Sequence, residues 1–207
     1  ILILIYLVCG VELQAQNYTF RNVVMSDGLS GLLVNAIYKD SEGFVWLGTD
    51  NCLDRFDGVK VRHFEFRGIE SGRKKRVNSV TETASKQLWV GNGIGLWRLN
   101  RTNSQLERIV PEKIDFAVNT LLANEDVLYI GTEKGLFIHK DGQLLQVLTD
   151  RNMLAACNRI MDICLNEDKT VLWLATVQGL FSYSLKDGKI DSWHFQENVP
   201  EADYFRC

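Results

Sequence analysis

The sequence is poor in several features that mark particular classes of protein. Its 207 residues include only 2 prolines and 3 histidines, and no uninterrupted apolar stretch approaches the roughly 18 residues of a membrane helix. Basic and acidic side chains number 23 and 26, so the net charge of -3 creates no broad positive field for a nucleic acid. A hydrophobic share of 46% excludes a disordered chain, because it is enough to build a core.

Motifs of the common enzyme classes are also missing. No G-x-S-x-G elbow, H-E-x-x-H helix, phosphate-binding loop or dinucleotide fingerprint occurs. His63, His139 and His194 stand far apart and no cysteine pair has C-x-x-C spacing, so we expect no metal site, no cofactor and no catalytic residue. The residues that could act as acids or bases follow the spacing of the repeat that is described below, rather than the spacing of a catalytic site. They are Asp40, Glu82, Asp162 and His194.

The N-terminal end combines an apolar run with a polar segment. Ile1 to Val8 is apolar throughout, and the polar stretch that follows ends near a small residue, Ala15. An apolar run of this length is typical of a secretory signal, and a buried first strand is the alternative. We therefore expect residues 1–15 to be the remnant of a signal peptide and 16–207 to form the exported domain.

The five cysteines give no evidence of a disulfide framework. Cys157 and Cys164 lie seven residues apart on one expected strand, which places them far beyond bridging distance at about 3.3 Å per residue. Disulfides stay open as an alternative, because an even number remains once Cys9 is removed with the signal. The favoured interpretation is that the remaining cysteines are small buried hydrophobic residues.

A repeat with a period of 40 to 44 residues organises the chain. Four segments align on an aromatic residue that is followed by an aliphatic residue and then by a small one. They are Val45–Thr49, Leu88–Asn92, Leu128–Thr132 and Leu172–Thr176. A period of this length built from strands is the signature of propeller blades. The sequence therefore predicts an all-β fold, a β-propeller of about four four-stranded blades.

Each period divides into four short strands separated by turn residues. The predicted blades cover about 32–66, 77–110, 118–148 and 157–195. In the first blade the predicted strands are Val34–Lys39, Gly43–Gly48, Leu53–Phe56 and Lys60–Phe66. Another strand is expected around Asn17–Arg21. Four blades make an incomplete ring whose last blade exposes an apolar face, and a closed four-bladed ring is the alternative.

The aromatic residue of each copy is expected to be structural. A large ring on the second strand can cover the neighbouring sheet, while the small residue two positions later lets the adjacent backbone approach. The four rings are Trp46, Trp89, Tyr129 and Trp173. Stacking against carbohydrate is the alternative role, and it requires exposure of the rings.

The opening copy resembles a specific family. Asp27-Gly28-Leu29-Ser30, Gly43-Phe44-Val45-Trp46-Leu47-Gly48-Thr49 and Arg55-Phe56-Asp57-Gly58 are similar to the two-component-regulator propeller repeat of periplasmic sensor regions in Bacteroidetes hybrid two-component systems. The likeness extends more loosely from about Tyr18 to Phe195. Cys52, Asn92 and Ala175 depart from the repeat, which usually has Gly, Thr and Gly there.

The resemblance implies the fold and function of a much longer receptor. It implies seven-bladed propellers in the periplasm, an inner-membrane anchor, a homodimer and a kinase downstream, with oligosaccharides as ligands. We accordingly expect this chain to be an N-terminal fragment of a ligand-sensing propeller that is not itself an enzyme. A propeller enzyme such as a polysaccharide lyase or hydrolase, and a protein-interaction scaffold, are the alternatives.

Candidate ligand-binding residues follow from the repeat. An asparagine stands at the start of each expected innermost strand, and these four are Asn35, Asn78, Asn119 and Asn158. A repeated asparagine at such a position is more commonly a cap of a turn or strand end, so both roles stay open. The basic run Arg73–Arg76 is expected to be a solvated loop rather than an anion-binding patch.

Overall fold

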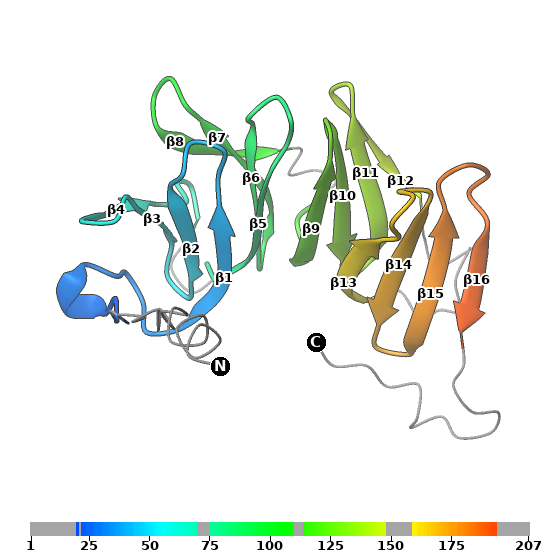
Figure 1. Ribbon diagram of the computed structural model, residues 1–207, viewed down its shortest axis with the longest axis horizontal. Helices are drawn as coiled ribbons and strands as arrows, with labels where there is room; N and C mark the ends of the chain where they lie inside the picture. Colours follow the sequence, from blue (N-terminus) through cyan, green and yellow to red (C-terminus); the bar gives the residue numbers. More distant parts are fainter. Residues whose placement is uncertain (1–19, 21, 70–74, 110–113, 148–158, 194–207) are drawn as a thin grey trace, which may run out of the picture.

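A computed structural model describes residues 20, 22–69, 75–109, 114–147 and 159–193 of the chain. Within these residues the fold is four antiparallel sheets of four strands each, and its one helical element is the 3-10 turn η1 (Met25–Asp27). Figure 1 shows the sheets side by side in an arc, with β4 near one end and β16 near the other. The all-β propeller architecture predicted from the repeat is therefore confirmed.

Each sheet is one blade, and its strands are hydrogen-bonded in sequence order. Blade 1 consists of β1 (Val34–Lys39), β2 (Val45–Thr49), β3 (Leu53–Phe56) and β4 (Val61–Phe64). Blade 2 consists of β5 (Val77–Glu82), β6 (Leu88–Asn92), β7 (Gly95–Asn100) and β8 (Gln105–Ile109). Blade 3 consists of β9 (Val118–Asn124), β10 (Val127–Thr132), β11 (Gly135–Lys140) and β12 (Gln143–Gln146). Blade 4 consists of β13 (Ile160–Leu165), β14 (Val171–Thr176), β15 (Gly179–Ser184) and β16 (Ile190–Trp193).

Most strand ends lie within one or two residues of the predicted ones, and the differences have local causes. β2 begins at Val45 rather than Gly43, because Gly43 has a φ of 92° and belongs to the turn. The Asp40 carboxylate closes that turn by accepting a hydrogen bond from Phe44 N at 2.9 Å. The strand expected around Asn17–Arg21 lies outside the described residues except for Phe20, which is not in a strand.

The innermost strand of each blade packs against the innermost strand of the next. β1 contacts β5, β5 contacts β9, and β9 contacts β13. The blades therefore radiate from a common inner side, as in a propeller.

The hydrophobic core is divided into three clusters, one between each pair of successive blades. Trp46 lies in the cluster between blades 1 and 2, Trp89 in the one between blades 2 and 3, and Tyr129 in the one between blades 3 and 4. All three rings are buried. Trp173, on the last blade, is only partly buried. The rings of the first three blades thus cover the next sheet, as expected.

The small residue after each ring makes room for a side chain of the next blade. A Cβ added at Gly48 would lie 2.5 Å from Val77 Cγ1, and one added at Gly91 would lie 2.5 Å from Val118 Cγ1. At Gly131 the close neighbour across the interface is Ile160. We expected a close approach of backbone. The structure instead places an aliphatic side chain of the neighbouring innermost strand in each socket.

The outer face of blade 1, which is the face turned away from blade 2, is not covered by any other described blade. Ile37 on β1 is 72% exposed, whereas the equivalent residue of each later blade is buried: Val80 is 7%, Leu121 7% and Ile163 5% exposed. Val34 is 39% exposed, against 0% for its equivalents Val77, Val118 and Ile160. In a closed four-bladed ring blade 4 would cover this face, so that alternative is wrong. The described blades form an incomplete ring.

Among the residues that the structure describes, no helix is long and apolar enough to cross a membrane. The segment expected to be a signal remnant, residues 1–15, lies outside the described part of the chain, so that expectation stays a prediction.

Candidate functional site

Each innermost strand carries a β-bulge at the same place. In blade 1, Val34 pairs with Thr49 and Ala36 with Gly48, so Asn35 is the extra residue of β1. The extra residues of the following innermost strands are Asn78, Asn119 and Met161. A bulge leaves its extra residue outside the regular ladder and redirects its side chain.

The four bulge residues line one cavity of about 500 Å³. The remaining lining residues come from the segments that precede the innermost strands and from the turns between second and third strands. They are Arg76, Gly93, Ala117, Glu133 and Arg159. The cavity therefore lies where the innermost strands begin, on the inner side of the arc.

Two of the asparagines join neighbouring blades. Asn78 Nδ2 donates to the carbonyl oxygen of Val118 at 2.9 Å, and Asn119 Nδ2 donates to the carbonyl oxygen of Ile160 at 2.8 Å. Their amide groups are thus held by the next blade, which is a structural role different from the turn or strand-end cap considered in the sequence. The side-chain oxygens of Asn78 and Asn119 take no part in these two hydrogen bonds.

Asn35 differs from these two residues. Its Nδ2 atom is buried and has no hydrogen-bond partner in the described structure. A buried amide donor without a partner is unfavourable by about 1 to 3 kcal/mol, and rotation of the side chain toward the cavity would let a ligand oxygen supply the missing acceptor. Of the three candidate asparagines that the structure describes, Asn35 is therefore the one that can turn toward a ligand without breaking an inter-blade hydrogen bond.

The fourth predicted asparagine is not the structural equivalent of the other three. Asn158 lies outside the described residues, and the register of β13 with β14 places Met161 at the bulge. The repeat in the sequence suggested Asn158 because Asn158 precedes Ile160 by two positions, just as Met161 precedes Ile163. The bulge side chain of blade 4 is thus an apolar thioether rather than an amide.

The charged groups of the cavity are of both signs. Arg76, Glu133 and Arg159 are exposed. The turns that carry them are fixed by backbone hydrogen bonds from Glu133 N to the Ala117 oxygen and from Val177 N to the Arg159 oxygen. Guanidinium, carboxylate and amide groups together can bind a hydroxyl-rich ligand. They do not form a nucleophile and base in hydrogen-bond contact.

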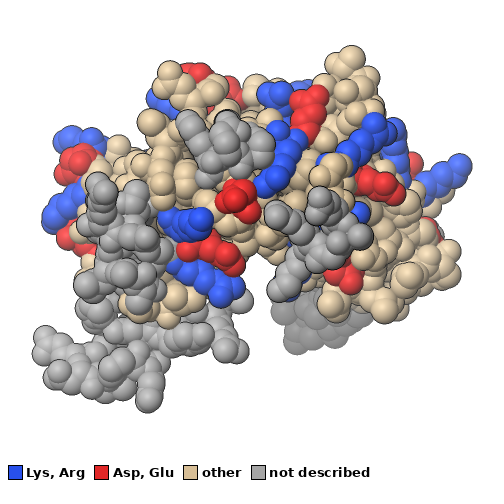
Figure 2. Space-filling view, turned by 180° about the vertical axis from the view of Figure 1, so that it is seen from behind, with Lys and Arg blue, Asp and Glu red and all other residues tan. Residues whose placement is uncertain are grey.

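The charged surface on the face shown in Figure 2 is mixed. Figure 2 shows Lys and Arg side chains next to Asp and Glu side chains over the face that it presents, without one large area of a single sign.

The residues considered as possible acids or bases have structural partners. The Asp40 carboxylate accepts from the indole Nε1 of Trp46 at 2.7 Å as well as from the turn. Asp162 accepts from the Thr120 hydroxyl at 3.0 Å, across the interface of blades 3 and 4. His194 lies outside the described residues. Asp40 and Asp162 are thus engaged in turns and blade contacts.

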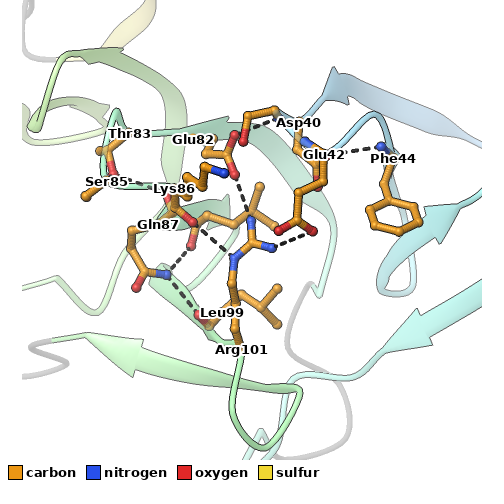
Figure 3. Close-up of polar contacts among 12 residues, drawn as sticks. Asp40, Glu42, Phe44, Glu82, Thr83, Ser85, Lys86, Gln87, Leu99 and Arg101 are labelled. Atoms are coloured by element: carbon orange, nitrogen blue, oxygen red, sulfur yellow. Dashed lines mark hydrogen bonds and ion pairs between the residues drawn. The ribbon is translucent and has the colours of Figure 1, made fainter.

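A polar network joins blades 1 and 2 at the opposite end of the innermost strands (Figure 3). Arg101 lies between two carboxylates, 2.7 Å from Glu82 Oε1 and 3.1 Å from Glu42 Oε2. Glu82 also accepts from Ser41 N at 2.8 Å, and Arg101 Nε donates to the Lys86 oxygen. Glu82, the fourth candidate acid or base, is therefore part of an inter-blade clamp.

A second polar cluster lies in blade 1, away from the cavity. The register of β3 with β4 pairs Asp54 with His63, and His63 Nδ1 lies 2.7 Å from Asp54 Oδ1. The Cys52 thiol donates to the same oxygen at 3.2 Å. Burial raises the pKa of this thiol to about 12, so it stays protonated near neutral pH. Cys52 is buried as expected, although in a polar contact, whereas Cys164 is exposed, against expectation.

Residues 28–51 match the family described as the two component regulator propeller. The match begins directly after η1 and covers β1, β2 and the start of the turn before β3, which contain most of the residues that carried the resemblance. No curated protein is similar enough to this chain to count as a match.

Solved structures with a similar fold include two extracellular domains of hybrid two-component systems and an enzyme. The extracellular domain of one hybrid two-component system of B. thetaiotaomicron has 23% identity and a TM-score of 0.65, over 81% of this chain and 23% of that one. A second such domain from B. thetaiotaomicron has 20% identity and a TM-score of 0.68, over 84% of this chain and 26% of that one. Virginiamycin B lyase from Staphylococcus aureus has 13% identity and a TM-score of 0.67, over 85% of this chain and 59% of that one.

Proposed function

We propose that this chain is part of a periplasmic ligand-sensing propeller of a hybrid two-component regulator, and that its cavity binds an oligosaccharide. The match of residues 28–51 to the regulator propeller family and the likeness to two extracellular sensor domains support the regulatory part of the proposal. The chain spans about a quarter of the length of those sensor domains. Signalling to a kinase, dimerisation and an inner-membrane anchor belong to the proposal for the longer receptor.

The single observation that carries the ligand site is the row of bulge residues along the cavity. Its volume of about 500 Å³ lies within the usual range of 300 to 1,000 Å³ for small-molecule sites. Amide and guanidinium groups suit the hydroxyls of a sugar, because they supply both donors and acceptors. The buried, unpartnered Nδ2 of Asn35 is the donor that a bound hydroxyl oxygen would satisfy.

The proposed mechanism is a shift between arrangements of the receptor. A rigid set of blades presents the cavity, and a ligand changes the balance of two arrangements only if it binds one more tightly than the other. The aromatic rings take no part in this recognition, because Trp46, Trp89 and Tyr129 are buried between blades.

Calorimetric titration with a panel of neutral and acidic oligosaccharides tests the proposal, with chromatography of each mixture to detect cleavage. Binding without cleavage is expected. We expect Asn35→Ala to weaken binding about tenfold, which corresponds to about 1.4 kcal/mol, with little change in melting temperature. Asn124→Ala is the matched control, since Asn124 ends β9 on the side away from the cavity.

Two results would contradict the proposal in different ways. Cleavage of a saccharide would favour the enzyme alternative, for which the likeness to virginiamycin B lyase shows only that the fold is compatible. Binding that Asn35→Ala and Asn124→Ala leave equally unchanged would place the ligand outside the cavity.

A further inference from the structure

Blade 1 departs from the other blades at two neighbouring positions of β3 and its preceding turn. Cys52 stands where the later blades have Gly95, Gly135 and Gly179. Two residues later, Asp54 stands where they have an aromatic residue, Trp97, Phe137 or Phe181. In the later blades a buried ring or a partly buried one fills this place, whereas blade 1 places a carboxylate there with 0% exposure.

Both departures converge on a histidine of the neighbouring strand. The possible ligand atoms of the three side chains, which are the Cys52 sulfur, an Asp54 carboxylate oxygen and a His63 ring nitrogen, all lie within 4.8 Å of one another. Asp54 Oδ1 is 3.2 Å from the Cys52 sulfur and 2.7 Å from His63 Nδ1. In a tetrahedral zinc site with bonds of 2.0 to 2.3 Å, ligand atoms are about 3.2 to 3.6 Å apart. The Cys52 sulfur and Asp54 Oδ1 already have this spacing, whereas Asp54 Oδ1 and His63 Nδ1 are at hydrogen-bond distance and must move apart by about 0.5 Å to share one cation.

The Asp54 carboxylate is also held in its orientation by hydrogen bonds to its second oxygen. Asp54 Oδ2 accepts from both the backbone nitrogen and the hydroxyl of Ser30, each at 2.8 Å. These two hydrogen bonds fix the rotation of the carboxylate, so that Oδ1 faces the thiol and the imidazole. Such a hydrogen-bonded support around a ligand is typical of metal sites in proteins.

We propose that Cys52, Asp54 and His63 form a site for one borderline-soft divalent cation, with Zn²⁺ as the fitting ion. One sulfur, one nitrogen and one oxygen ligand suit zinc, whereas calcium and magnesium take oxygen ligands. On binding, the cation takes the place of the hydrogens that now point at Asp54 Oδ1. The thiol proton leaves to solvent, and His63 carries its single proton on Nε2 so that Nδ1 can coordinate.

The site has an open side. The His63 side chain is 47% exposed, while that of Asp54 is fully buried. A cation can thus enter along the histidine, and water fills its fourth coordination position. A bound ion would tie Ser30, through Asp54, to the strands of blade 1 and so hold the segment before β1 in place.

Cobalt is the probe, because Co²⁺ occupies zinc sites and a Co²⁺–thiolate bond has a near-ultraviolet charge-transfer band that shows sulfur ligation directly. The full 207-residue chain is titrated with Co²⁺ under reducing conditions and then with Zn²⁺. We expect one equivalent of Co²⁺ to produce the band and Zn²⁺ to abolish it.

Variants separate this cluster from the other thiols. Cys52→Gly installs the residue that the other three blades carry, so it is expected to fold and to lose the band. The matched control Cys164→Ser, which removes the exposed thiol of β13, is expected to keep it. Ser30→Ala is expected to keep the band and to weaken Co²⁺ binding about tenfold, as changes behind a ligand commonly do.

The outcomes are unambiguous. No band in the unaltered chain, a band that persists in Cys52→Gly, or a band that is lost in Cys164→Ser would each overturn the proposal. If circular dichroism shows that Cys52→Gly is unfolded, His63→Ala decides the question, because this exposed side chain can be removed without a cavity. It must weaken Co²⁺ binding at least about tenfold, and unchanged binding would overturn the assignment.

Discussion

Ile37 and Ile163 occupy the same position in the first and the last blade, and they allow a matched test of the open arc. Ile163 is 5% exposed at the interface of blades 3 and 4, whereas Ile37 is 72% exposed on the outer face of blade 1. Truncation to alanine removes three side-chain carbons. At about 0.8 kcal/mol for each buried carbon group, the transfer contribution at Ile163 is about 2.4 kcal/mol.

The cavity that remains adds to this value at Ile163. Buried isoleucine-to-alanine substitutions destabilise by about 2 to 5 kcal/mol in total, whereas a change at an exposed site such as Ile37 is worth at most about 0.5 kcal/mol. With a urea m value of about 2 kcal/mol/M, Ile163→Ala is expected to lower the unfolding midpoint by about 1 M or more. Ile37→Ala is expected to leave it within about 0.25 M.

Urea titration followed by tryptophan fluorescence and circular dichroism measures both midpoints. Because each blade contacts only its neighbours, hydrogen exchange should show the loss at Ile163 first in β13–β16. Equal midpoint shifts for the two variants would refute the open arc, since they would mean that the outer face of blade 1 is covered in the folded chain.

Three further predictions concern the blade interfaces. Gly91→Ala places a Cβ 2.5 Å from Val118 Cγ1, and such overpacking is expected to destabilise the chain by about 1 to 3 kcal/mol; an unchanged urea midpoint would contradict the socket. Arg101→Ala leaves the 4% exposed carboxylate of Glu82 without its ion pair, so a loss of about 1 to 3 kcal/mol is expected. Substitution of Glu82 by Gln in the same background should recover part of it, and no recovery would argue against the clamp. Burial, with a smaller contribution from a nearby arginine, lowers the pKa of His139 below its usual 6.5. The unfolded chain then binds more protons than the folded one below about pH 6.5, so the melting temperature should fall as pH falls through that window. His139→Gln should flatten the dependence, and an equally steep profile in the variant would contradict it.

The repeat predicted the blades well because each blade is a local structure. Strand ends were set by turn residues next to them, such as Asp40 and Gly43, and these are visible in the sequence. The resemblance favoured an incomplete ring over a closed one, whereas the repeat by itself did not separate the two, because that difference depends on contacts between the first and last blades.

The site was predicted only in part, because both clusters depend on pairing between strands. The bulge that makes Met161 the equivalent of Asn119 is a shift of register, and a strand with one extra residue reads like any other strand. The approach of His63 to Asp54 was missed because the two are nine residues apart. A signal was available, since a hairpin whose turn runs from Asp57 to Lys60 pairs these positions.

The bulges have a consequence for how such a protein can change. Three inner strands carry an asparagine at this point and one carries a methionine, yet all four keep the same pairing on either side. The backbone pairing around the bulge therefore tolerates exchange of the extra residue, because the ladder does not depend on its side chain. Single replacements at the bulges of such a propeller can therefore change which ligand the cavity prefers, while the pairing of the strands stays the same.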